Sequence, residues 1–181
     1  MNIQNSLNWT PPDHWLQIRT IDAHTGGEPL RIILDGFPEL AGDTILDRRR
    51  TAKSQYDHLR TALMWEPRGH ADMYGAIMTE PVEEGSDFGV FFLHNEGYSS
   101  MCGHAILAVT TLAYTTGLVP FNKPELLFDT PAGKVKANPH FRNGDLDRVS
   151  FRNVPSFILL ENRTVRLGGI GDVQFDIAFG G

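Results

Sequence analysis

The stretch MCGHAILAVTTLAYTTG, residues 101–117, predicts the element around which the rest of the chain folds. Most positions from Ala105 to Ala113 are apolar, so a helix over residues 101–115 would have almost no polar face. A helix that is apolar on nearly all sides is buried. Ser99 or Ser100 is the expected N-cap and Gly117 the expected stop. We therefore expect one central, buried helix.

Short strands separated by turn residues are predicted for much of the remaining chain. They cover residues 16–23, 30–34, 73–78, 88–93, 126–129, 134–137, 148–151, 157–160 and 173–178. A glycine-containing turn over residues 24–29 separates the first two. Thr44 and Asp47 form an acidic variant of the capping box at the start of a second helix, residues 44–64. Strands around a central helix make an α+β lobe over residues 16–181, after an irregular tail, residues 1–15.

Composition excludes several classes of partner. The chain has 181 residues and a net charge of −6, which argues against nucleic acid, because phosphate binding needs a basic surface. The basic run Arg48–Arg50 is interpreted as a solvated helix face. The apolar run after Cys102 is too short to span a membrane. The seven histidines follow no metal-binding spacing, so a metal is not expected.

Cys102 is the single cysteine and cannot form an internal disulfide, so we expect a free thiol in a reducing cytoplasm. One interpretation is a packed thiol, since free cysteines are among the most buried residues. The other is chemical. In the first turn of a helix, unpaired N–H groups and the helix dipole lower a thiol pKa and can also hold a carboxylate. Gly103 would leave the backbone open to a ligand, and His104 could add a hydrogen bond.

Other polar residues leave their roles open. Glu66, Arg68, His70 and Asp72 could support a site or form a local turn network. Asn95 precedes the central helix, and we expect it to position a loop.

Six blocks, in this order, resemble the proline racemase family. They are Asp22–Glu28 (DAHTGGE), Glu66–His70 with Asp72–Gly75 (EPRGH, DMYG), Met101–His104 (MCGH), Asp129–Gly133 (DTPAG), Asn153–Ser156 (NVPS) and Asp176–Gly181 (DIAFGG). The stretch HNEGYSSMCGHA, residues 94–105, is most similar to the trans-3-hydroxy-L-proline dehydratases of that family.

The resemblance implies a diaminopimelate epimerase-like fold of two lobes, with the substrate between the N-termini of two central helices. It implies that Cys102 takes the α-hydrogen, that Gly103 and His104 hold the substrate carboxylate, and that Tyr74 lines the substrate ring. It implies no cofactor.

Family members run to roughly twice this length, so we expect residues 16–181 to be the N-terminal lobe alone. The resemblance places the residue facing Cys102 on the other lobe, as Thr in dehydratases and Cys in racemases. We therefore expect the chain alone to be inactive, and its exposed apolar face to favour association, for example as a homodimer. The alternatives are a proline racemase or 4-hydroxyproline 2-epimerase, and a non-catalytic lone lobe.

Overall fold

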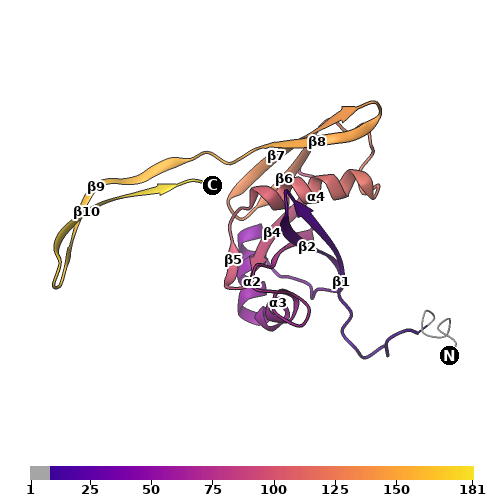
Figure 1. Ribbon diagram of the computed structural model, residues 1–181, viewed down its shortest axis with the longest axis horizontal. Coiled ribbons are helices and arrows are strands. Elements are labelled where there is room, and N and C mark those ends of the chain that lie inside the picture. Colours follow the sequence, from indigo (N-terminus) through magenta and orange to yellow (C-terminus); the bar gives the residue numbers. More distant parts are fainter. Residues whose placement is uncertain (1–8) are drawn as a thin grey trace.

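The computed structural model describes residues 9–181, which form a lobe with a long β-hairpin projecting from it (Figure 1). The lobe contains an eight-stranded sheet of mostly antiparallel pairs, in the order β1-β2-β3-β4-β6-β7-β8 with β5 paired to β4. Among the strands of residues 9–181, only the pairs β2–β3 and β4–β6 are parallel. The elements are β1 (Arg19–Thr25), β2 (Glu28–Asp35), α2 (Ile45–Gln55), α3 (Asp57–Met64), β3 (Tyr74–Thr79), β4 (Phe88–His94), β5 (Gly97–Ser99), α4 (Gly103–Thr115), β6 (Leu126–Thr130), β7 (Gly133–Arg142), β8 (Asp145–Arg152), β9 (Phe157–Leu167) and β10 (Gly171–Phe179).

Side chains of the central strands point alternately to the two faces of the sheet, so a hydrophobic core lies on each face. On β4, Val90 and Phe92 point to the core that contains α4, whereas Phe91 and Leu93 point to the core that contains α2 and α3. Successive side chains of a strand face opposite sides, so a strand covered on both faces is apolar throughout. The predicted α+β class and central buried helix are confirmed. The structure adds a second helical layer, α2 and α3, behind the sheet.

Eight of the thirteen residues of helix α4 are buried, including Ile106, Val109 and Ala113. It ends as predicted: Gly117 adopts a positive φ of 74° after the C-cap. The predicted N-cap is wrong. Cys102, rather than Ser99 or Ser100, occupies that position with extended φ and ψ of −152° and 111°. Ser99 instead ends the short strand β5, which the sequence did not predict.

The predicted helix over residues 44–64 is in fact two helices. Thr44 caps α2 as expected, because its hydroxyl oxygen accepts a hydrogen bond from the Asp47 N–H at 3.1 Å. Tyr56, with φ −127°, interrupts the helix. The interpretation of the arginine run is also wrong in part: Arg48 donates to the Glu80 carbonyl and Arg49 to the Tyr98 carbonyl.

The first hairpin turn is tighter than predicted. Only Gly26 and Gly27 lie between β1 and β2, with φ of 62° and 104°. Two successive positive φ angles favour glycine in a two-residue hairpin. The predicted tail is irregular where it is described, at residues 9–15, and its residues 1–8 lie outside the described part.

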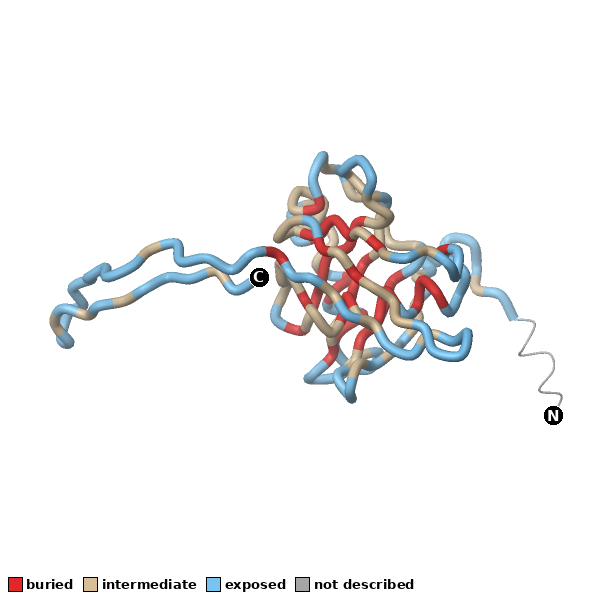
Figure 2. Tube along the Cα trace, turned by 90° about the horizontal axis from the view of Figure 1, so that it is seen from above, coloured by how far each residue is buried: buried red, intermediate tan, exposed pale blue. Residues whose placement is uncertain are grey.

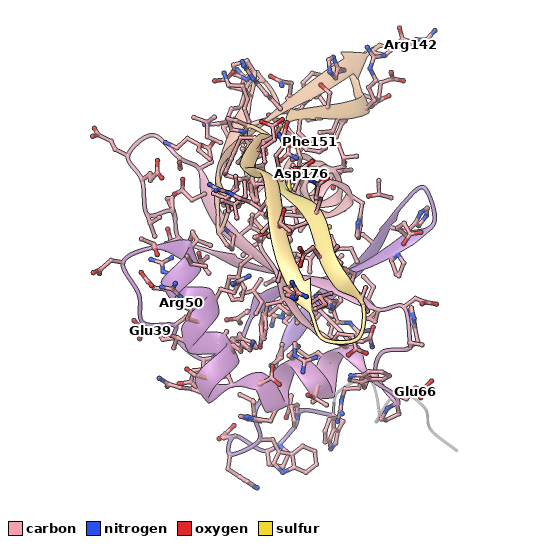
Figure 3. The ribbon with its side chains drawn as sticks, turned by 90° about the vertical axis from the view of Figure 1, so that its left-hand side faces the viewer. Glu39, Arg50, Glu66, Arg142, Phe151 and Asp176 are labelled. Carbon is pink, nitrogen blue, oxygen red and sulfur yellow. The ribbon has the colours of Figure 1, made fainter. Side chains whose placement is uncertain are left out.

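Strands β9 and β10 pair with each other and with no other strand of residues 9–181. They project from the lobe and are exposed along most of their length, as Figure 2 shows, and Figure 3 views the molecule from the side on which they project. On β10, apolar Val173, Phe175, Ile177 and Phe179 alternate with Asp172, Gln174, Asp176 and Ala178. One face of the hairpin is therefore mostly apolar. Its base returns to the lobe, where Phe179 packs against the α4 core.

Candidate active site

The predicted site residues Tyr74, Cys102, Gly103 and His104 come together at the N-terminal end of α4. The Cys102 sulfur lies 3.1 Å from His104 Nδ1, and the rings of His104 and Tyr74 meet edge to face at 5.0 Å. Cys102 is 9% exposed and belongs to the α4 core. The first N–H groups of a helix have no partner within it. The thiol thus lies beside N–H groups that can receive an anion.

The pKa of Cys102 shifts in the direction opposite to the one expected from the sequence. Burial raises the pKa of the Cys102 thiol, and the N–H groups of Ala105 and His104 and the Tyr74 hydroxyl oppose this only in part. The expected helix-start effect is present, but loss of water outweighs it. Burial also raises the pKa of Tyr74 to about 12, so Tyr74 remains a hydrogen-bond donor at neutral pH.

Neighbouring strands orient these side chains. Thr25, at the end of β1, donates to the His104 carbonyl at 2.9 Å. The Tyr74 hydroxyl bonds with the Ser99 hydroxyl of β5. The His94 ring stacks on Tyr74, with centroids 5.7 Å apart and planes 20° apart. Burial lowers the pKa of His94, which keeps this ring neutral at neutral pH. Strands β1 and β3 therefore contact the end of α4, and β4 and β5 hold Tyr74 in place.

Packing explains why position 103 carries no side chain, which the sequence did not reveal. A Cβ at this position would lie 2.8 Å from Cζ of Phe151 on β8. The side of Gly103 that we expected to be open to a ligand is therefore covered by an aromatic ring. Phe151 lies just before the Asn153–Ser156 block, and Thr25 lies inside the Asp22–Glu28 block. The Asp22–Glu28 block was the available signal for Thr25, whereas Phe151 lies outside every block.

Main-chain carbonyls of the segment around residues 66–72 accept hydrogen bonds that help to hold the lobe together. The Arg31 guanidinium forms a bidentate ion pair with Asp22 and also donates to the carbonyls of Leu63 and Arg68. The side-chain amide of Asn95 donates to the carbonyls of Met64 and His70. Asn95 thus fixes a loop, as expected.

Two surface hollows lie away from the thiol. One, of about 690 Å³, lies between residues 33–40 and 77–80. The other, of about 420 Å³, lies between β1 and the Leu107–Thr115 side of α4. Cys102 lines neither of them. Within residues 9–181, no group of three or more His, Cys, Asp or Glu residues could hold a metal, and no helix is long and apolar enough to cross a membrane.

The proline racemase family pattern matches residues 20–181. The chain belongs to the proline racemase family. It is 49% identical over 178 residues to a trans-3-hydroxy-L-proline dehydratase of Colwellia psychrerythraea, covering 96% of this chain and 50% of that protein. It is 47% identical over 166 residues to a 3-hydroxyproline 2-epimerase of Burkholderia multivorans, covering 91% and 50%.

The fold agrees with this membership. A crystal structure of a hydroxyproline epimerase from Agrobacterium vitis, with bound trans-4-hydroxy-L-proline, superposes with a TM-score of 0.75 and 27% identity. The superposition covers 89% of this chain and 48% of the epimerase chain. The chain spans about half the length of the curated relatives it matches.

Proposed function

We propose that this chain is the N-terminal lobe of a cofactor-independent trans-3-hydroxy-L-proline dehydratase. The single observation that carries the proposal is the thiol of Cys102, placed at the start of α4 and 3.1 Å from His104, in a chain 49% identical to a dehydratase. The reaction is the loss of water to give 1-pyrroline-2-carboxylate. The setting we propose is the reducing cytoplasm, where the single thiol stays free.

The substrate carboxylate binds at the helix start, where the N–H groups of Gly103 and His104 offset its charge. The Cys102 thiolate removes the proton from Cα and becomes a thiol. The electron pair left on Cα forms a double bond to C3 as the C3–O bond breaks, and the hydroxyl leaves as water after taking a proton. The enamine then moves a proton to carbon and becomes the cyclic imine.

Burial of Cys102 in this lobe has a consequence for the first step. Because burial raises the pKa of the thiol, only a minority of molecules carry the thiolate at neutral pH unless another group favours it. A bound cationic substrate amine near the sulfur would favour the thiolate. Tyr74 stays protonated and can donate to the sulfur.

A facing lobe is part of this proposal, because Cys102 lines neither of the two hollows described above and the second reacting group is expected on the other lobe. The chain alone is expected to show no turnover. A hybrid that joins residues 1–181 to the remaining half of the Colwellia psychrerythraea dehydratase is expected to convert trans-3-hydroxy-L-proline. Mass spectrometry would detect the loss of water, and Cys102→Ser in the hybrid should abolish it.

An isomerase of the same family is the second candidate, favoured by the similarity to a 3-hydroxyproline 2-epimerase. Heavy water separates the two. Deuterium at Cα with inverted configuration and no loss of water would replace the dehydratase with an epimerase or racemase. Turnover by the chain alone would remove the need for a facing lobe. A hybrid that folds but neither dehydrates nor exchanges the α-hydrogen would favour a non-catalytic lobe.

A further inference from the structure

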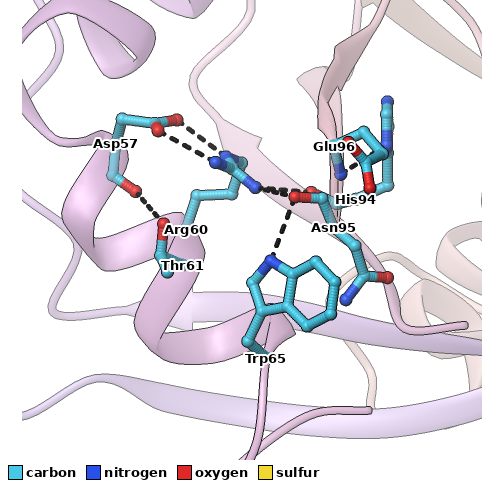
Figure 4. A network of polar contacts seen from close by, with 7 residues as sticks. All are labelled: Asp57, Arg60, Thr61, Trp65, His94, Asn95 and Glu96. Carbon is cyan, nitrogen blue, oxygen red and sulfur yellow. Dashed lines mark hydrogen bonds and ion pairs between the residues drawn. The ribbon is translucent and has the colours of Figure 1, made fainter. Parts of the chain in front are cut away.

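Helix α3 carries a buried cation that no step of the proposed reaction uses. Arg60 is 8% exposed and pairs with Asp57, with nitrogen–oxygen distances of 2.7 and 2.9 Å. Its Nη1 donates to two main-chain carbonyls, those of His94 at 2.9 Å and of Asn95 (Figure 4). The guanidinium also lies over the Tyr98 ring, 5.8 Å from the centroid. A buried guanidinium costs free energy unless its donors are used, and Arg60 forms four hydrogen bonds, two to Asp57 and two to main-chain carbonyls.

All the carbonyls and the ring that Arg60 contacts belong to one segment, the β4–β5 hairpin. The same turn is held twice more. Trp65, just after α3, donates from its indole N–H to the Asn95 carbonyl at 3.2 Å, and Asn95 donates back to the Met64 carbonyl at 3.0 Å. The hairpin is therefore fixed to the end of α3 rather than to α4.

The other side of this hairpin faces Cys102. His94, whose carbonyl Arg60 holds, stacks on Tyr74, and Ser99 bonds with the Tyr74 hydroxyl. Tyr74 then contacts the His104 ring at 5.0 Å, and His104 lies 3.1 Å from the sulfur of Cys102. An unbroken series of contacts runs from α3 to the thiol.

We propose that Arg60 is a positioning residue for Cys102, which it acts on through the β4–β5 hairpin, Tyr74 and His104. The role deepens the proposed function and rests on Cys102 being the reactive group. Arg60 keeps the hairpin against Tyr74, and Tyr74 keeps water away from the sulfur while offering its hydroxyl. The titratable side chains around the sulfur are Tyr74 of β3 and His104 of α4, with His94 of β4 behind Tyr74.

The test measures the alkylation rate of Cys102 by iodoacetamide against pH, in the 181-residue chain. Its single cysteine makes the signal unambiguous. In Arg60→Met the apolar stem is kept and the donors are lost. Water should then reach the sulfur, the midpoint of the pH profile should move to lower pH, and the rate at about pH 7 should rise at least about threefold. Arg60→Lys, which keeps the charge but not the forked donors, should lie between.

Two controls separate positioning from general loosening. Arg50→Met removes an ion pair of the same spacing, Arg50–Asp47, whose arginine side chain is 67% exposed, and should leave the profile unchanged. Ile45→Val weakens the core behind the sheet and should lower the unfolding midpoint without moving the pH midpoint.

A wild-type pH midpoint in folded Arg60→Met and Arg60→Lys would overturn the proposal, even if their rates rise, because access alone would then explain the rise. Should Arg60→Met fail to fold, Arg60→Lys decides by the same criterion. The assay needs no substrate. A shifted midpoint together with an inactive hybrid would therefore refute the dehydratase and leave the positioning role in place.

Discussion

An alanine at position 103 would measure how tightly β8 packs on the start of α4. The new Cβ would lie 2.8 Å from Cζ of Phe151, whereas ordinary contacts begin near 3.4 Å, so the ring would have to retreat by about 0.6 Å. Overpacking of this kind costs about 1–3 kcal/mol, and alanine recovers up to about 1 kcal/mol of helix propensity. We expect Gly103→Ala to lower the free energy of unfolding by about 1 kcal/mol.

Urea unfolding would give this value, and two variants sharpen it. Gly168→Ala lies in the β9–β10 turn, where a Cβ would meet nothing within 4 Å, and should change the free energy of unfolding by less than about 0.5 kcal/mol. Phe151→Leu should cost less in the Gly103→Ala background than in the wild type, because the two changes relieve one contact. A Gly103→Ala protein as stable as the wild type, with no coupling to Phe151→Leu, would refute the packing argument.

Two further predictions concern the thiol and the hairpin. Because burial raises the folded-state pKa of Cys102, the protonated thiol stabilises the fold below the unfolded-state pKa, about 8.5, and this contribution is lost as pH rises through the folded-state value. The stability of the wild type relative to Cys102→Ser should therefore fall as pH rises above about 8.5 in urea titrations; a constant difference would contradict it. The apolar face of β10 should drive self-association, which analytical ultracentrifugation would measure. Ile177→Lys should reduce the association, whereas Gln174→Lys, on the other face, should not. A monomeric wild type would count against this prediction.

Local patterns predicted several elements because their causes are local. The Thr44 cap, the Gly117 stop and the glycine turn each depend on a few neighbouring residues. The break at Tyr56 was missed because apolar residues continue at helical spacing across it. Strand β5 was missed because three residues carry too little pattern to predict a strand.

For the candidate site, too, local features could be predicted and contacts between distant segments could not. Its candidate residues were selected from the chain alone: one cysteine, followed by glycine and histidine, before an apolar helix, within six ordered blocks. Their environment was not, because it depends on contacts between distant segments. Phe151 over Gly103, Ser99 beside Tyr74 and the burial of Cys102 all arise when β3, β5 and β8 meet at the end of α4.

The order of residues along this chain thus specified a buried helix with a thiol at its start, since periodicity and composition are properties of the chain alone. The direction of the thiol pKa required the folded lobe. Desolvation depends on how many atoms from other segments surround the sulfur, and here it outweighs the helix-start effect that the local sequence favours.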